Sequence, residues 1–179
     1  MLAECGVEAQ AVKWSQELDG LDGLIVPGGE STTIGKLMVR YGFHEAIPAA
    51  HAGGMAIYGT CAGLIILAKK ITEGAQPLLG LLDVEARRNA FGRQVASFEA
   101  DLALPILGDI PFKGVFIRAP WVERALAEDV EVLATHNGHI VAVRQGRLLA
   151  SAFHPELTDD GRMHEYFLEK VVASARRTG

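Results

Sequence analysis

The sequence predicts an α/β protein, a three-layer sandwich in which helices cover both faces of a mostly parallel central sheet. Short apolar runs alternate with helical patterns along the 179 residues, and several apolar runs end in glycine-rich loops. Apolar residues make up 49% of the chain and charged residues 22%, which is typical of a globular protein. A chain of this length suits one domain with a sizeable core, so we expect residues 1–179 to form a single domain.

The first part of the chain is predicted to alternate strands with helices. The strands are expected at residues 24–26 and 55–58, which are short apolar runs next to glycines. The helices are expected from Ser31 or Thr32, either of which can cap, to just before Gly42, and over about 44–52 and 62–70. The inner face of the first helix would carry Ile34, Leu37 and Met38.

The second part of the chain is richer in strand patterns. Residues 81–119 have a strand-like pattern, and His136-Asn137-Gly138 is a hairpin turn between strands at 130–134 and 139–143. A further strand over 148–153 leads to His154, and an amphipathic helix is expected at 163–172. Because ligands in such sheets bind at the carboxyl ends of the strands, the loops after 24–26 and 55–58 are expected to share one site.

Cys61 is the strongest chemical signal in the sequence. It lies in Gly59-Thr60-Cys61-Ala62-Gly63, which has the form of a nucleophile elbow with cysteine in place of serine. At the start of a helix, free N–H groups and the dipole favour a thiolate. His154 could exchange the proton and Glu156 could orient the imidazole, although a buried structural cysteine is the alternative interpretation.

Composition argues against several other classes of protein. The net charge of -5, without a basic block, argues against nucleic acid as a partner. No apolar run is long enough to span a membrane, and the N-terminus lacks a signal-peptide pattern. Two cysteines make no disulfide framework and fit a reducing cytoplasm, where we expect the protein. His136 and His139 lack neighbouring acidic or cysteine ligands, so we expect no metal.

Several segments together resemble class I (triad) glutamine amidotransferases, and within them the glutaminase subunits of pyridoxal 5′-phosphate synthases. The resemblance implies a flavodoxin-like fold and covers the chain from about Ala3 onward. The segments that carry it are Pro27-Gly28-Gly29-Glu30-Ser31-Thr32-Thr33, the Cys61 elbow, Arg88-Asn89-Ala90-Phe91-Gly92-Arg93-Gln94, Gly114-Val115-Phe116-Ile117-Arg118-Ala119-Pro120 and His154-Pro155-Glu156-Leu157-Thr158.

The resemblance implies a function and a set of site residues. Cys61 would attack the amide of L-glutamine and form a thioester, releasing ammonia for pyridoxal 5′-phosphate (vitamin B6) synthesis by a partner synthase subunit in a hetero-oligomeric complex. His154 would accept the thiol proton and pass it to the leaving ammonia. Glu156 would orient the imidazole of His154. The N–H groups of Gly28, Gly29 and Ala62 would stabilise the oxyanion, and the glutamine contacts would be Gly29, Glu30, Ser31, Arg88, Ile117 and Arg118. No cofactor is implied.

The chemistry of glutamine supports part of this assignment. Its carboxylate needs a cation, and Arg88 can hold a carboxylate in a planar fork. Its ammonium needs an anion, which Glu30 can supply. The alternatives are an ordinary surface arginine and an acidic residue that complements a helix dipole.

The resemblance leaves one difference and two alternatives. Family members begin with a parallel strand and a Leu-Gln-Gly loop, and we expect both to be absent here, because Met1-Leu2-Ala3-Glu4-Cys5-Gly6 matches the end of the following helix. The alternative functions are another thiol hydrolase of the same architecture and a catalytically impaired binding subunit. Arg88-Asn89 and His154-Pro155-Glu156 argue against the first, and the intact Cys61–His154–Glu156 set against the second.

Overall fold

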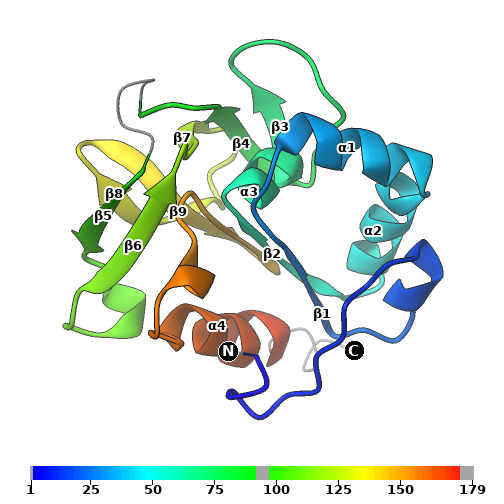
Figure 1. Ribbon diagram of the computed structural model, residues 1–179, viewed down its shortest axis with the longest axis horizontal. Coiled ribbons are helices and arrows are strands. Elements are labelled where there is room, and N and C mark those ends of the chain that lie inside the picture. The colour runs from blue at the N-terminus through cyan, green and yellow to red at the C-terminus, as the bar shows by residue number, and fades with distance from the viewer. Residues whose placement is uncertain (1, 92–96, 174–179) are drawn as a thin grey trace.

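The computed structural model describes residues 2–91 and 97–173. Figure 1 shows the layers, with α1, α2 and α3 on one side of the sheet and α4 on the other. The helices, 3-10 turns (η1 to η3) and a π-helical turn (η4) are η1 (Ser15–Leu18), α1 (Ser31–Arg40), α2 (Phe43–Ala52), α3 (Ala62–Leu67), η2 (Pro105–Leu107), η3 (Pro155–Leu157), α4 (Arg162–Tyr166) and η4 (Phe167–Val172).

The strands form one large mixed sheet and one small hairpin. Their bounds are β1 (Gly23–Val26), β2 (Ala56–Thr60), β3 (Ala68–Ile71), β4 (Leu82–Arg87), β5 (Ser97–Leu102), β6 (Phe112–Ile117), β7 (Trp121–Ala125), β8 (Glu131–His136), β9 (His139–Gln145) and β10 (Leu148–Ser151). The large sheet has the order β1-β2-β10-β9-β7-β4-β3, with β8 paired to β9, while β5 pairs with β6. Strands β1, β2 and β10 are parallel neighbours, as are β3 and β4, and the other pairings are antiparallel. The predicted α/β sandwich is confirmed.

The parallel strands at the centre of the sheet are covered on both faces. Every residue of β2 and β10 is buried, which explains why both are continuous runs of apolar and small residues. The helix α3 contacts β2 on one face, and η4 contacts it on the other. Gly23 on β1 meets η4 so closely that a Cβ there would lie 3.0 Å from Cγ2 of Val172.

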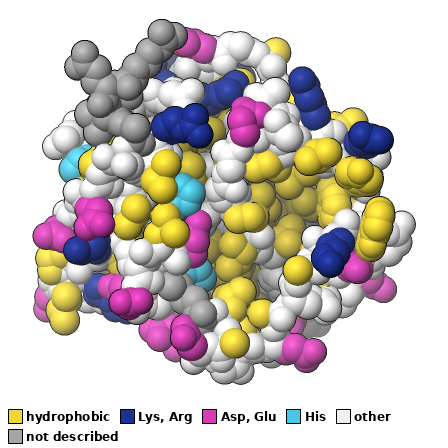
Figure 2. All heavy atoms as spheres, viewed as in Figure 1, with side chains coloured by type: hydrophobic (Ala, Val, Ile, Leu, Met, Phe, Trp, Pro, Cys, Tyr) yellow, Lys and Arg dark blue, Asp and Glu magenta, His cyan; other side chains and the backbone are white. Residues whose placement is uncertain are grey.

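The sheet is less covered at its β1 edge than at its centre. Leu24 and Ile25 of β1 are only partly buried, and Leu37 of α1 is 44% exposed. Figure 2 shows hydrophobic side chains gathered in a hollow on this side of the molecule, over β1 and the helices α1 and α2. The prediction that Leu37 lies on the inner face of the helix is therefore wrong, whereas Met38 does pack against the core.

Two local predictions are corrected by tertiary contacts. The helix expected over 62–70 ends at Leu67, because Ala68–Ile71 pair with β4 as the strand β3, and that pairing overrides the local helical pattern. The helix α1 is capped by Glu30 rather than by Ser31 or Thr32. A glutamate can replace the usual short cap because its longer side chain folds back onto the first turn.

The other predicted elements are found close to their expected positions. The hairpin between β8 and β9 turns at Asn137 and Gly138, whose φ angles of 49° and 79° are those of a tight two-residue turn. The helix expected at 163–172 is present, although from Phe167 it has π-helical geometry. Gly92, Arg93 and Gln94 of the Arg88 motif lie outside the described residues. Over 2–91 and 97–173, no helix has the length and apolar character needed to cross a membrane.

Candidate active site

The backbone turns sharply at Cys61, between β2 and α3. Cys61 has φ 50° and ψ −105°, a strained conformation for a residue with a side chain. The flanking glycines make the turn possible: a Cβ on Gly63 would lie 2.1 Å from the carbonyl oxygen of Val26, and one on Gly59 would lie 2.6 Å from that of Gly63. The predicted elbow is therefore a close-packed joint between β1, β2 and α3.

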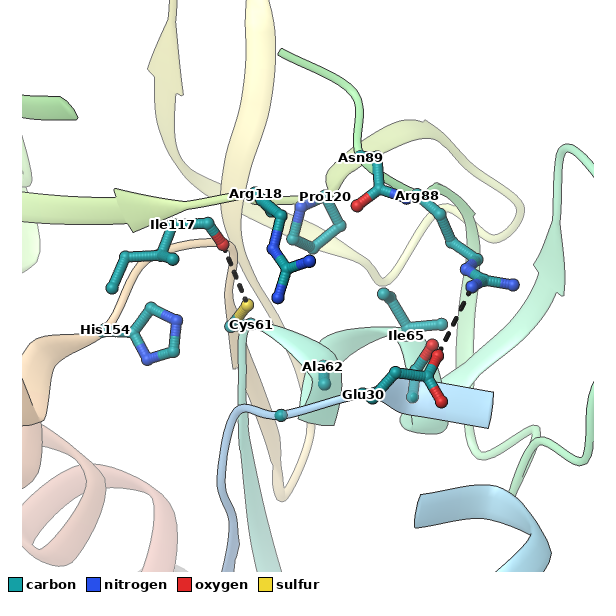
Figure 3. Close-up of a pocket in the computed structure, with 12 residues that line it drawn as sticks. Glu30, Cys61, Ala62, Ile65, Arg88, Asn89, Ile117, Arg118, Pro120 and His154 are labelled. Carbon is teal, nitrogen blue, oxygen red and sulfur yellow. Dashed lines mark hydrogen bonds and ion pairs between the residues drawn. The ribbon is translucent and has the colours of Figure 1, made fainter. Parts of the chain in front are cut away.

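The thiol of Cys61 faces a cavity of about 420 Å³. Cys61 is only 6% exposed, and its sulfur lies 3.9 Å from the carbonyl oxygen of Ile117, to which the thiol donates. Figure 3 shows the sulfur between this carbonyl group and the ring of His154. Ala62 is the first residue of α3, so its N–H group has no partner within the helix and is placed beside the sulfur.

His154 is brought to the thiol by the end of β10. Its Nδ1 lies 2.8 Å from Oε1 of Glu156, which fixes the proton on Nδ1 and leaves Nε2 as the other exchangeable position. The ring also rests on Gly28, where a Cβ would come within 2.3 Å of its Cε1. Glycine at position 28 is thus required for the ring to occupy this place.

The electrostatics of this group favour a charged imidazole. The hydrogen bond with Cys61 and then that with Glu156 raise the pKa of His154 to about 10, against the opposing effect of burial. Burial is the largest single influence and acts to raise the pKa of Glu156, but the hydrogen bond with His154, a backbone hydrogen bond and the nearby charges of His154 and His164 together lower the pKa below its ordinary value. These hydrogen bonds stabilise the protonated ring, so His154 can take up the proton of the Cys61 thiol and hold it as an imidazolium beside Glu156.

The opposite end of the cavity carries a pair of opposite charges. Nη2 of Arg88 lies 3.6 Å from Oε1 of Glu30, and Figure 3 shows this pair across the cavity from Cys61. The carboxylate of Glu30 also accepts from the N–H groups of Thr32 and Thr33, at 3.2 and 2.7 Å. The side-chain and backbone hydrogen bonds from Thr33 lower the pKa of Glu30 to about 2, so it is ionised at neutral pH.

The cavity brings most of the predicted site residues together. Its lining consists of Gly29, Glu30, Ser31, Cys61, Ala62, Ile65, Arg88, Asn89, Ile117, Arg118, Pro120 and His154. Gly28 and Glu156 do not line it and instead contact His154. Sequence reasoning missed Ile65, Asn89 and Pro120, although Asn89 and Pro120 stand inside segments singled out for resemblance. Asn89 and Arg118 both have φ 43°, so the backbone is also strained where these residues meet the cavity.

The arrangement suits a small zwitterion with a reactive carbonyl group. The cavity has the size of a small-molecule site, with a cation and an anion at one end and a thiol beside the His154 imidazole at the other. Within the part of the chain that the structure describes, no group of three or more His, Cys, Asp and Glu side chains is placed to hold a metal ion.

Comparison with known proteins places the chain in a family. Residues 1–173 match the model of the SNO glutamine amidotransferase family. The chain is 52% identical over 176 residues to pyridoxal 5′-phosphate synthase subunit PdxT of Pelotomaculum thermopropionicum, covering 98% of this chain and 89% of the relative. It is 57% identical to the subunit of the same name from Herpetosiphon aurantiacus, over 94% of this chain and 90% of the relative.

A solved structure agrees with these matches. A crystal structure described as a glutamine amidotransferase superposes with a TM-score of 0.88 at 53% sequence identity, covering 96% of this chain and 90% of that one. A putative GMP synthase subunit from Thermoplasma acidophilum, at 19% identity and a TM-score of 0.58, shares the fold.

Proposed function

The chain belongs to the SNO glutamine amidotransferase family, and we propose that it hydrolyses L-glutamine as the glutaminase subunit of a pyridoxal 5′-phosphate synthase. The observation that carries the proposal is Cys61, held at a strained elbow beside the His154–Glu156 pair. The names of the similar proteins from Pelotomaculum and Herpetosiphon supply the pathway, and the fit of the cavity to a zwitterionic amino acid supports the substrate.

The reaction begins when the thiol of Cys61 gives its proton to His154, and this leaves the reactive thiolate. It attacks the side-chain amide carbon of glutamine, and the N–H group of Ala62 and those of Gly28 and Gly29 stabilise the oxyanion, each such donor contributing about 3 kcal/mol. The imidazolium of His154 gives its proton to the departing nitrogen, so ammonia leaves and a glutamyl thioester remains. His154 then takes a proton from water as the water attacks the thioester, which releases glutamate and restores the thiolate.

The charged end of the cavity orients the substrate for this attack. Arg88 takes the α-carboxylate of glutamine, while Glu30 takes the α-ammonium, so the 3.6 Å pair opens to admit a zwitterion of complementary charge. Ile117 and Arg118 close the side of the cavity next to the sulfur. Anchoring both charges fixes the distance from the head group to the amide carbon, which confers selectivity for glutamine by chain length.

The ammonia passes to a synthase subunit in a hetero-oligomeric complex. Ammonia released into water is protonated and is no longer a nucleophile, so docking that raises glutaminase activity avoids wasted hydrolysis. Two free cysteines, Cys5 and Cys61, suit a reducing compartment, and we place the protein in the cytoplasm.

The test is release of glutamate and ammonia from L-glutamine, measured for the chain with and without a synthase subunit. We expect turnover that rises on adding the synthase subunit and falls by roughly a thousandfold or more in the Cys61→Ala protein. The Cys61→Ala protein should keep the parent circular dichroism spectrum, which separates lost chemistry from lost fold. Glutamine turnover at the parent rate in Cys61→Ala, or none in the parent complex, would contradict the proposal.

A further inference from the structure

The loop that joins β3 to β4 passes close to α1 (Figure 1), and it contacts the helices α1, α2 and α3. A Cβ on Gly35 of α1 would lie 2.6 Å from the carbonyl oxygen of Pro77, so the loop and the helix are in close contact. The N–H group of Leu79 donates to the carbonyl oxygen of Ile66 on α3 at 2.7 Å. The carbonyl oxygen of Leu78 is hydrogen-bonded to Nε2 of His44 on α2 at 2.9 Å. The position of this loop is therefore fixed relative to the first turn of α1.

Gln76 lies in this loop and accepts hydrogen bonds from two hydroxyl groups of α1. Its Oε1 accepts from Oγ of Ser31 at 3.0 Å and from Oγ1 of Thr32 at 3.3 Å. Ser31 is 4% exposed and lines the cavity next to Glu30. Gln76 itself does not line the cavity, so it can act on a bound molecule only through the residues that it holds.

The other end of the Gln76 amide is buried and unpaired. Its Nε2 has no hydrogen-bond partner in the structure as described over 2–91 and 97–173. A buried donor without a partner lowers stability, and an apolar side chain of the same shape would avoid that cost. An amide side chain at position 76 therefore packs less favourably than an apolar one would. The hydrogen bond that its oxygen accepts from Ser31 gives a better reason for its presence.

The hydrogen bond to Gln76 determines what Ser31 can offer to a ligand. A serine hydroxyl has one proton to donate, and here Gln76 accepts it. Only the lone pairs of the Ser31 oxygen remain for the cavity, so Ser31 can accept from an ammonium group but cannot donate to a carboxylate. The adjacent carboxylate of Glu30 favours the same charge at the same end of the cavity.

We propose that Gln76 is a positioning residue that makes Ser31 a hydrogen-bond acceptor for the α-ammonium group of the substrate. The inference rests on the proposed glutaminase function, since it assumes that the cavity binds glutamine. Gln76 therefore contributes to selection of α-amino acids over amides that lack the amino group, without contacting the substrate.

The experiment measures binding rather than turnover. In the Cys61→Ala background, in complex with the synthase subunit, calorimetry gives the Kd of L-glutamine and of glutaramate, which has the same amide and carboxylate but no ammonium. Gln76→Met keeps the shape and removes the strong acceptor, while Gln76→Glu keeps an acceptor. His44→Ala is the matched control, because it loosens the same loop without touching Ser31.

Gln76→Met should weaken glutamine binding about tenfold and change glutaramate binding less than about twofold. Gln76→Glu should restore most of the preference, and His44→Ala should leave the ratio of the two Kd values unchanged. Equal weakening of both ligands would mean that Gln76 only supports the fold and would overturn the inference.

Turnover of glutamine by the parent complex, measured in parallel, separates this inference from the proposed function. A parent complex that binds glutamine without hydrolysing it would contradict the function but leave the role of Gln76 standing. An active parent whose Gln76→Met variant keeps the parent Kd ratio would contradict only the role of Gln76. Absence of glutamine binding in every variant would overturn both.

Discussion

Around Cys61 the cavity is closed and tightly packed, whereas around Glu30 and Arg88 it is open to solvent. Cys61 is 6% exposed and its glycine neighbours leave no room for a single added carbon, while the side chains of Glu30 and Arg88 are 58% and 31% exposed. The close-packed end fixes atoms to within fractions of an ångström, which nucleophilic attack requires. The charged end acts through forces that fall off slowly with distance, so its groups tolerate solvent and movement.

The two ends of the cavity should respond differently to substitution. Changes at the close-packed end should affect the chemical step or the stability of the fold, and changes at the charged end should mainly affect substrate affinity.

Removing the imidazole should cost nearly as much activity as removing the thiol. We expect His154→Ala to lower kcat by roughly a thousandfold or more, because thiolate formation and proton delivery to ammonia depend on the same ring. Glu156→Gln should cost less, since Glu156 only orients His154. Steady-state glutamate release with the synthase subunit present measures both. A Glu156→Gln loss larger than that of His154→Ala would contradict the assigned roles.

Adding one methyl group to the elbow should destabilise the fold. In Gly63→Ala the new carbon would lie 2.1 Å from the carbonyl oxygen of Val26, so β1 and α3 must separate. We expect a loss of about 1–3 kcal/mol in the free energy of unfolding, as for other overpacked sites. Urea unfolding followed by circular dichroism measures it. Gly161→Ala is the control, because its nearest contact would be 3.7 Å away; an equal loss there would contradict the close-packing argument.

Removing the cation at the charged end should weaken substrate binding. We expect Arg88→Ala to raise the KM for glutamine about tenfold, the effect of losing a charge-assisted hydrogen bond at a partly exposed site. Its kcat should change much less, and Arg88→Lys should recover only part of the loss, because an ammonium cannot form the planar fork. Unchanged kinetics in Arg88→Ala would instead identify it as an ordinary surface arginine.

The raised pKa of His154 should make stability depend on pH. The folded-state pKa of about 10 exceeds the ordinary value of 6.5, so folding takes up a proton between these values. The stabilisation is complete below about pH 6.5 and is lost as pH rises through about 10. The Tm difference between the parent and His154→Gln should therefore shrink over this range.

Cys61→Ala supplies the control for that pH dependence. It removes the largest cause of the raised pKa, so the range over which His154 stabilises the fold should contract toward pH 6.5. Thermal unfolding of the parent and both variants across this range is the measurement. A parent Tm difference that stayed constant from pH 6.5 to 10 would show that His154 is not held as an imidazolium.

Local sequence was sufficient wherever a feature is built by neighbouring residues. The elbow needs small residues on both sides of Cys61, and the Asn137-Gly138 turn needs residues that accept positive φ. Both features could therefore be predicted from short stretches of sequence. The positions of β2 and β10 followed from buried apolar runs, and the short His154-Pro155-Glu156 segment already contained the imidazole and its carboxylate.

Other features were decided by contacts between distant parts of the chain. Ala68–Ile71 form a strand because they pair with β4. Glu30 both caps α1 and pairs with Arg88, which lies far along the sequence. The hydrogen bond between Gln76 and Ser31 spans 45 positions, and the close contact between Gly28 and His154 spans more than twice that. Sequence patterns record the preferences of each backbone segment and of its near neighbours. Which side chains then meet, and which atom each presents, depends on how the packed layers bring distant segments together.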